Sequence, residues 1–98
     1  MLVMPTLFES VSIPVYEAFA LEVPVVASNV TALPEQIGDA GLLFDPLDPD
    51  ALAAAIAQVL RDEGLSRALA AKGVVRIRGF DPSAYAMRLT QVVAELIA

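Results

Sequence analysis

The chain has 98 residues, of which 57% are hydrophobic, and its six basic and twelve acidic residues give a formal net charge of −6. It contains no cysteine and no histidine, which excludes disulfides, thiolate catalysis, cysteine metal sites and histidine chemistry. The basic residues are few and scattered, which excludes a nucleic-acid surface. We therefore expect any chemistry to depend on carboxylates, hydroxyls, backbone amides and cations.

The length predicts a single domain over residues 1–98, large enough to bury a core. No apolar run approaches the roughly 18–20 residues that cross a bilayer, and no basic segment precedes an apolar one at the N-terminus. We therefore expect no membrane span and no signal peptide, and predict a cytoplasmic protein. The hydrophobic share exceeds the usual level of roughly 45–50%, which indicates that some surface meets a partner.

The first half of the chain alternates short apolar runs with helical segments. Leu2–Met4 predicts a buried strand that Pro5 closes, and a helix is expected from Pro14 to about Leu21, since proline suits the first turn of a helix. Two more buried strands are predicted with a short helix between them, and Gly38 ends that helix. These three elements are Val25–Ala27, Leu33–Ile37 and Gly41–Phe44.

Strands that alternate with helices favour parallel crossovers and a sheet that is covered on both faces. The predicted fold class is therefore α/β, a partial Rossmann-like parallel sheet of about three strands followed by a helical C-terminal region. In such sheets ligands bind beyond the carboxyl ends of the strands. Glu9 lies just past the end of the first predicted strand.

The second half predicts three helices. The first begins with Asp48 as N-cap and Pro49, and ends at Gly64. The second runs from about Ser66 to Arg78, where Gly79 stops it, and the third begins at Asp81 and Pro82. Phe80 and Tyr85 have the spacing of a hydrophobic staple. The apolar residues expected to face the core are Leu52, Ile56, Val59, Leu60, Leu65, Leu69, Val75, Leu89, Val92, Val93 and Leu96.

The most informative segment lies between the first predicted strand and helix, where Glu9 and Glu17 stand eight positions apart. The start of a helix presents unpaired N–H groups and the positive end of its dipole, which suit a phosphate. Carboxylates are good acceptors for sugar hydroxyls. Together these features indicate a nucleotide-sugar site. The alternatives are that Glu17 is a first-turn acid favoured by the helix dipole and that Glu9 is a solvated loop charge.

Four blocks of the sequence resemble the retaining nucleotide-sugar glycosyltransferases of family 4, which have the two-domain GT-B fold. Glu9-Ser10-x-x-x-Pro14-x-x-Glu17-Ala18-x-Ala20 resembles the E-x7-E motif of that family. The other three blocks occupy residues 24–30, 33–43 and 45–52, in the same order as in the family. The resemblance covers nearly the whole chain and implies the C-terminal, donor-binding part of such an enzyme.

The resemblance implies roles for individual residues. Glu17 holds the ribose hydroxyls of the nucleotide, and Glu9 faces hydroxyls of the donor sugar. The donor-sugar site also includes Ser10, Val11, Ser12 and Ile13. The backbone amides of the last three of these meet the sugar and the diphosphate. For the two serines, a role in capping the helix or closing a turn is an alternative.

The implied chemistry uses a nucleotide-diphosphate sugar as donor substrate, with no metal and no other cofactor. No catalytic residue is assigned. Asp45, Asp48 and Asp50 are interpreted as caps and turns rather than as a metal cluster, and Arg76 and Arg78 as a solvated helix face.

Two positions depart from the family pattern. Ser10-Val11-Ser12 stands where the family usually has Gly-Phe-Gly or Ser-Phe-Gly, which adds a Cβ where the backbone should approach the diphosphate. Glu22 replaces a glycine that usually ends the helix, at a cost of about 1 kcal/mol if φ is positive there.

The chain is expected to lack the acceptor domain and to be catalytically incompetent alone, because an acidic pocket binds a diphosphate weakly. The alternative is a non-enzymatic truncated or split module that self-associates or binds a partner chain through an exposed sheet edge. An epimerase on the same fold ranks last, because such enzymes need histidine or additional acids in the cleft.

Overall fold

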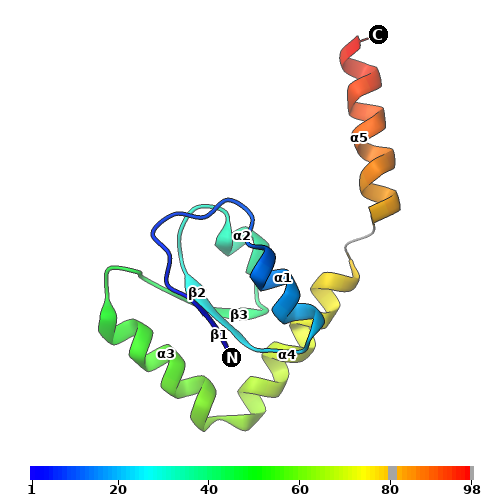
Figure 1. Cartoon of the computed structure of the whole chain (residues 1–98). Helices are drawn as coiled ribbons and strands as arrows, with labels where there is room; N and C mark the ends of the chain where they lie inside the picture. The colour runs from blue at the N-terminus through cyan, green and yellow to red at the C-terminus, as the bar shows by residue number, and fades with distance from the viewer. Residues whose placement is uncertain (80–81, 98) are drawn as a thin grey trace.

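The computed structural model describes residues 1–79 and 82–97. Its centre is a three-stranded parallel sheet in the order β1-β2-β3, shown in Figure 1. β1 (Leu2–Met4) pairs with β2 (Val25–Ser28) in the register Val3 to Val26, and β2 pairs with β3 (Gly41–Phe44) in the register Val26 to Leu42. The predicted strands are confirmed, and the fold is the expected α/β arrangement with a three-stranded parallel sheet.

Helices cover both faces of the sheet, as expected. α1 (Ile13–Ala20) and α2 (Leu33–Ile37) connect the strands and share a buried cluster with Val25 and Ala27. Val26 points to the opposite face, where it clusters with residues of α3 (Pro49–Arg61) and α4 (Glu63–Arg78). This alternation follows from the pleat of β2, whose four residues are all buried.

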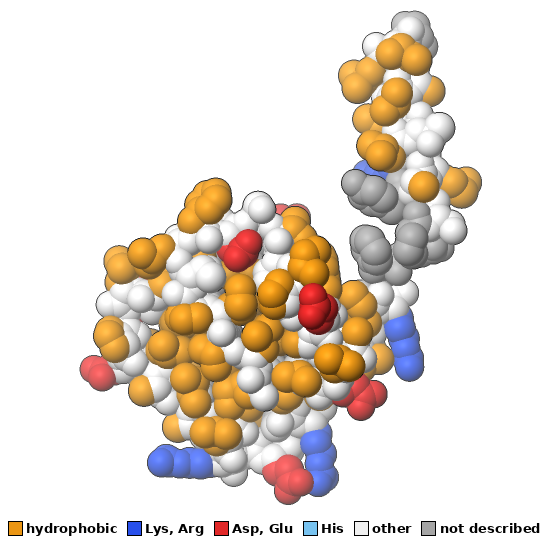
Figure 2. All heavy atoms as spheres, in the orientation of Figure 1, with side chains coloured by type: hydrophobic (Ala, Val, Ile, Leu, Met, Phe, Trp, Pro, Cys, Tyr) orange, Lys and Arg blue, Asp and Glu red, His pale blue; other side chains and the backbone are white. Residues whose placement is uncertain are grey.

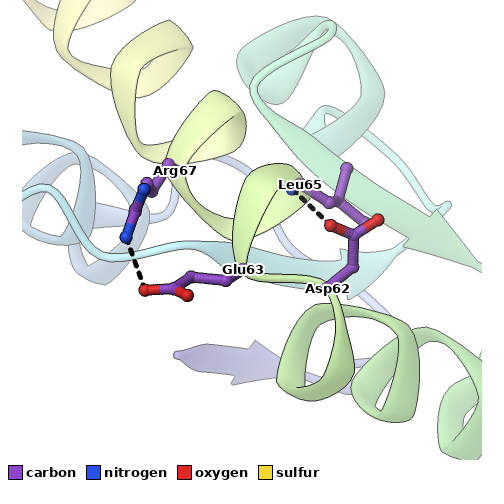
Figure 3. Close-up of polar contacts among 4 residues, drawn as sticks. All are labelled: Asp62, Glu63, Leu65 and Arg67. Carbon is purple, nitrogen blue, oxygen red and sulfur yellow. Dashed lines mark hydrogen bonds and ion pairs between the residues drawn. The ribbon is translucent and has the colours of Figure 1, made fainter.

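The boundary between α3 and α4 differs from the prediction of an end at Gly64 and a new start near Ser66. Asp62 closes α3, since its N–H donates to the carbonyl of Gln58 at 3.0 Å, and its carboxylate accepts from the N–H of Leu65 at 2.9 Å. Figure 3 shows this cap beside the exposed 2.6 Å ion pair between Glu63 and Arg67. One aspartate in extended backbone conformation thus ends one helix and starts the next, so Gly64 is tolerated within α4.

The predicted apolar faces are confirmed only where a helix lies on the sheet. Val59 and Leu69 are buried, and Leu52, Ile56 and Leu65 are half-buried. Leu60 and Val75 were expected in the core but are exposed. Val75 is exposed because α4 turns Gly73, two positions earlier, toward Phe19 of α1, which directs Val75 outward.

α5 (Pro82–Ile97) extends away from the sheet and its covering helices, as Figure 1 shows. Its expected buried face is wrong: Leu89, Val92, Val93 and Leu96 are all exposed, and Figure 2 shows hydrophobic side chains along this helix. An amphipathic pattern reports which face is apolar but not what covers it. The predicted cap at Asp81 and the staple of Phe80 with the Tyr85 side chain lie outside the described residues.

Across the part of the chain that the structure describes, no helix combines the length and apolar character needed to cross a membrane.

Candidate functional site

The candidate site is the loop from Glu9 to Ser12, which follows β1 at the carboxyl edge of the sheet and leads into α1. Ser12 adopts an extended conformation, and its hydroxyl accepts from the N–H of Val15 at 3.4 Å. Ser12 is therefore the N-cap of α1, and Pro14 occupies the first turn. The predicted helix start at Pro14 is correct to within one residue.

Thr31, in the segment between β2 and α2, holds the backbone of Glu9. Its Oγ1 accepts from the N–H of Glu9 at 3.1 Å and donates to the carbonyl of the same residue. One hydroxyl thus engages both backbone groups of a residue 22 positions earlier in the chain. The side chain of Glu9 is half-buried at this place.

Gln36 of α2 holds the other end of the loop. Its Oε1 accepts from the N–H of Ser12 at 3.0 Å, and its Nε2 donates to the carbonyl of Ser12 at 2.7 Å. Ser12 is 1% exposed, so these bonds satisfy backbone groups that water cannot easily reach. The Ser12 amide, which was expected to meet the donor, is therefore already occupied.

The amides on either side of Ser12 are differently placed. Val11 and Ile13 are exposed, and within residues 1–79 and 82–97 we find no hydrogen-bond partner for the N–H of either. Of the three amides predicted to meet a diphosphate, these two remain available in the described structure.

Arg76 connects α4 to this site. Its Nε donates to the carbonyl of Gln36 at 3.1 Å and its Nη2 to the carbonyl of Glu35 at 2.9 Å. Arg76 is exposed, as the prediction of a solvated helix face requires, but it also binds α2, because the last turn of α4 passes the end of that helix. This contact joins residues 40 positions apart, which no local pattern reveals.

A pocket of about 540 Å³ adjoins the loop. Ser10 and Val11 line it together with Tyr16 of α1, Gln36 of α2 and Arg76 of α4. Arg76 thus places a cation of the late helices close to the predicted donor loop. Glu9 and Glu17 do not line this pocket; Glu17 is exposed on α1.

Two acidic residues after β3, Asp45 and Asp48, have the turn and capping roles that the sequence predicts. Asp48 caps α3 through a 3.1 Å bond from the N–H of Ala51, and Asp45 accepts from the N–H of Leu47 at 2.9 Å. Among the described residues, no group of three or more acidic, cysteine or histidine side chains is arranged to hold a metal ion.

Sequence reasoning missed Thr31 and Gln36. A threonine in a loop and a glutamine on a short helix carry no signal of their own, because their partners lie 22 and 24 positions away. The positive φ of 48° at Thr31 marks this residue as unusual, but the sequence does not reveal it.

The chain is similar to parts of larger glycosyltransferases. It is 45% identical over 78 residues to the O-antigen chain mannosyltransferase B of Escherichia coli, a match that covers 80% of this chain and 20% of that protein. It is 42% identical over 59 residues to the MMP alpha-(1->4)-mannosyltransferase of Mycolicibacterium hassiacum, which covers 57% of this chain and 14% of the relative.

Among solved structures, the sucrose-phosphate synthase of Thermosynechococcus elongatus matches with a TM-score of 0.85 and 34% identity, over 97% of this chain and 25% of that one. The chain thus spans about a quarter or less of each protein it matches. The family model described as "Glycosyl transferases group 1" matches residues 1–62, which include the sheet, α1, α2, α3 and the candidate site. The chain therefore belongs to the group 1 glycosyl transferases.

Proposed function

We propose that this chain forms the donor side of a retaining glycosyltransferase of family 4, which moves a sugar from a nucleoside-diphosphate sugar to an acceptor. The observation that carries the proposal is the Glu9–Ser12 loop, held at the carboxyl edge of the parallel sheet within the segment that matches the family. Ligands of open parallel sheets bind at this edge, and the start of α1 favours an anion.

In this proposal the residues of the E-x7-E motif divide the donor between them. Glu17 binds the ribose hydroxyls and Glu9 those of the donor sugar, while the amides of Val11 and Ile13 meet the diphosphate. The exposure of Glu17, Val11 and Ile13 supports these roles, because all three are accessible to a ligand. Ser12 instead supports the loop, since its hydroxyl and its backbone N–H and carbonyl groups already have partners.

The transferred sugar is proposed to be mannose, because two of the relatives described above are named as mannosyltransferases. The 98-residue chain alone is proposed to bind the donor weakly and not to turn it over, since its net charge of −6 repels a diphosphate.

A thermal-shift and calorimetric titration of the chain with UDP-, GDP- and ADP-linked mannose and glucose tests the proposal. A donor present at ten times its Kd should stabilise the fold by about 1.4 kcal/mol. Glu17→Ala should abolish this response. Glu22→Ala is the matched control, because it removes an exposed carboxylate just beyond the same helix. No response to any of the six compounds would contradict donor binding by this segment.

A further inference from the structure

We infer that Thr31 and Gln36 are positioning residues that hold the Glu9–Ser12 loop in the shape that receives the donor. The inference deepens the proposed function and rests on it. The Thr31 side chain binds the backbone N–H and carbonyl of Glu9, where the loop begins. The Gln36 side chain binds the same two groups of Ser12, where the loop ends. We call these two contacts the loop clamps.

The Thr31 clamp is maintained against a conformational cost. Thr31 has a φ of 48°, in the left-handed region that a β-branched residue rarely adopts. Such strained residues persist where the surrounding structure compensates them, and they concentrate at ligand sites. Here the identifiable compensation is the hydroxyl, which engages the N–H and the carbonyl of Glu9.

The Gln36 clamp is geometrically matched to a residue's backbone. The side-chain amide offers one acceptor and one donor, and Ser12 presents the complementary N–H and carbonyl at 3.0 and 2.7 Å. Gln36 is half-buried, and its backbone carbonyl accepts a hydrogen bond from Arg76 of α4. The position of Gln36 is therefore set by two helices rather than by its side chain alone.

The two clamps determine what the loop presents. Because Glu9 and Ser12 are tied down, Ser10 and Val11 between them are displayed on the exposed side, where both line the adjoining pocket. Since Gln36 occupies the Ser12 amide, a diphosphate is left with the amides of Val11 and Ile13. The clamps thus select which backbone groups a donor can use.

Amide hydrogen exchange of the 98-residue chain, followed by NMR, tests the clamps without any ligand. Gln36→Met keeps the length of the side chain and removes both hydrogen bonds, and should accelerate exchange of the Ser12 amide about tenfold. Thr31→Val should do the same for the Glu9 amide, while Thr31→Ser, which keeps the hydroxyl, should preserve its protection. The Val26 amide in β2 is the internal control and should not change. Unaltered exchange of both loop amides would overturn the inference.

Donor titration separates positioning from stability. Thr31→Gly and Thr31→Val both remove the hydroxyl, but only glycine relieves the positive φ, so the glycine variant should melt at a higher temperature than the valine variant. Both should weaken binding of the nucleotide sugar to a similar extent, about tenfold, as should Gln36→Met. If the affinity instead decreased in the same order as the melting temperature, with the valine variant weaker than the glycine variant, the role would be merely structural and the inference would be overturned.

The outcomes distinguish this inference from the function on which it rests. If the unmodified chain binds a nucleotide sugar and the three variants bind it equally well, the positioning role is overturned and the proposed function stands. If the unmodified chain has protected Glu9 and Ser12 amides but binds none of the six compounds, the proposed function fails, and the donor role of Thr31 and Gln36 fails with it.

Discussion

Gly73 of α4 lies against the ring of Phe19 of α1 so closely that a Cβ built on Gly73 would stand 2.7 Å from Cδ1 of that ring. Phe19 is 1% exposed, and Gly73 is buried as well. The absence of a side chain at Gly73 therefore allows the two helices to approach. The same approach brings Arg76, one turn later, to the end of α2, so this contact also supports the candidate site.

Replacing Gly73 with alanine is expected to lower the free energy of unfolding by about 1–2 kcal/mol. Alanine gains about 1 kcal/mol in helix propensity, but the overpacking against Phe19 costs more. Gly64→Ala in the same helix is the matched control, because among the described residues a Cβ there would meet Asp62 Oδ1 alone, at 3.4 Å. Denaturant unfolding should show unchanged or slightly raised stability for the control. Equal effects of the two substitutions would contradict the proposed close contact.

Glu22, just after α1, has a φ of 60°. This is the positive φ for which the sequence predicts a conformational cost, because glutamate stands where the family usually has glycine. Glu22→Gly is expected to stabilise the fold by about 1 kcal/mol, because glycine adopts this φ without a Cβ clash. Thermal unfolding should show a rise of about 4–8 °C. Glu22→Ala removes the same charge but keeps a Cβ, so it should give no such rise. If both variants were equally stabilised, relief of charge repulsion would be the cause instead.

The sheet and its connecting helices are predictable because their signals are local. β2 is a short β-branched run that follows Pro24, α2 ends at Gly38, and Asp48 with Pro49 starts α3, as expected. Each of these features depends on the conformation of one or two residues. These features can therefore be predicted from a few consecutive residues.

The missed features depend on contacts between distant parts of the chain. The loop clamps need α2 to lie beside the loop after β1, and the outward face of Val75 depends on how Gly73 meets α1. The apolar residues of α5 follow the helical period, yet the described residues do not cover them. For the candidate site, the sequence predicts where it lies, whereas the residues that hold its shape emerge only from the tertiary arrangement.

Truncation of two valines on different helices should change the stability by different amounts. Val59 of α3 is 4% exposed and clusters with Val26 and Phe44, whereas Val92 of α5 is 44% exposed. Val59→Ala should lower the free energy of unfolding by about 2 kcal/mol, from lost burial and the cavity that remains. Val92→Ala should change it by less than about 0.5 kcal/mol. Denaturant unfolding measures both, and a comparable loss at Val92 would mean that the face of α5 is covered in solution.

Arg76 and Arg78 are nearby cations on α4 with different surroundings, so substitution of Arg78 is a matched control for substitution of Arg76. Arg76 donates to the carbonyls of Glu35 and Gln36, whereas the described residues provide no hydrogen bond to the Arg78 side chain. Arg76→Gln should therefore reduce stability by about 1 kcal/mol, because two carbonyls at the end of α2 lose charged donors. Arg78→Gln removes the same charge and should have little effect.

The same pair tests whether the end of α4 supports the loop through α2. Because Arg76 fixes the backbone carbonyl of Gln36, its loss should also accelerate exchange of the Ser12 amide, which Gln36 holds from its side chain. Arg76→Lys keeps the charge but loses the forked geometry that reaches two carbonyls at once, so its effect should lie between those of glutamine and the unmodified residue. Hydrogen exchange that was unchanged in Arg76→Gln would mean that α2 holds Gln36 in place without α4.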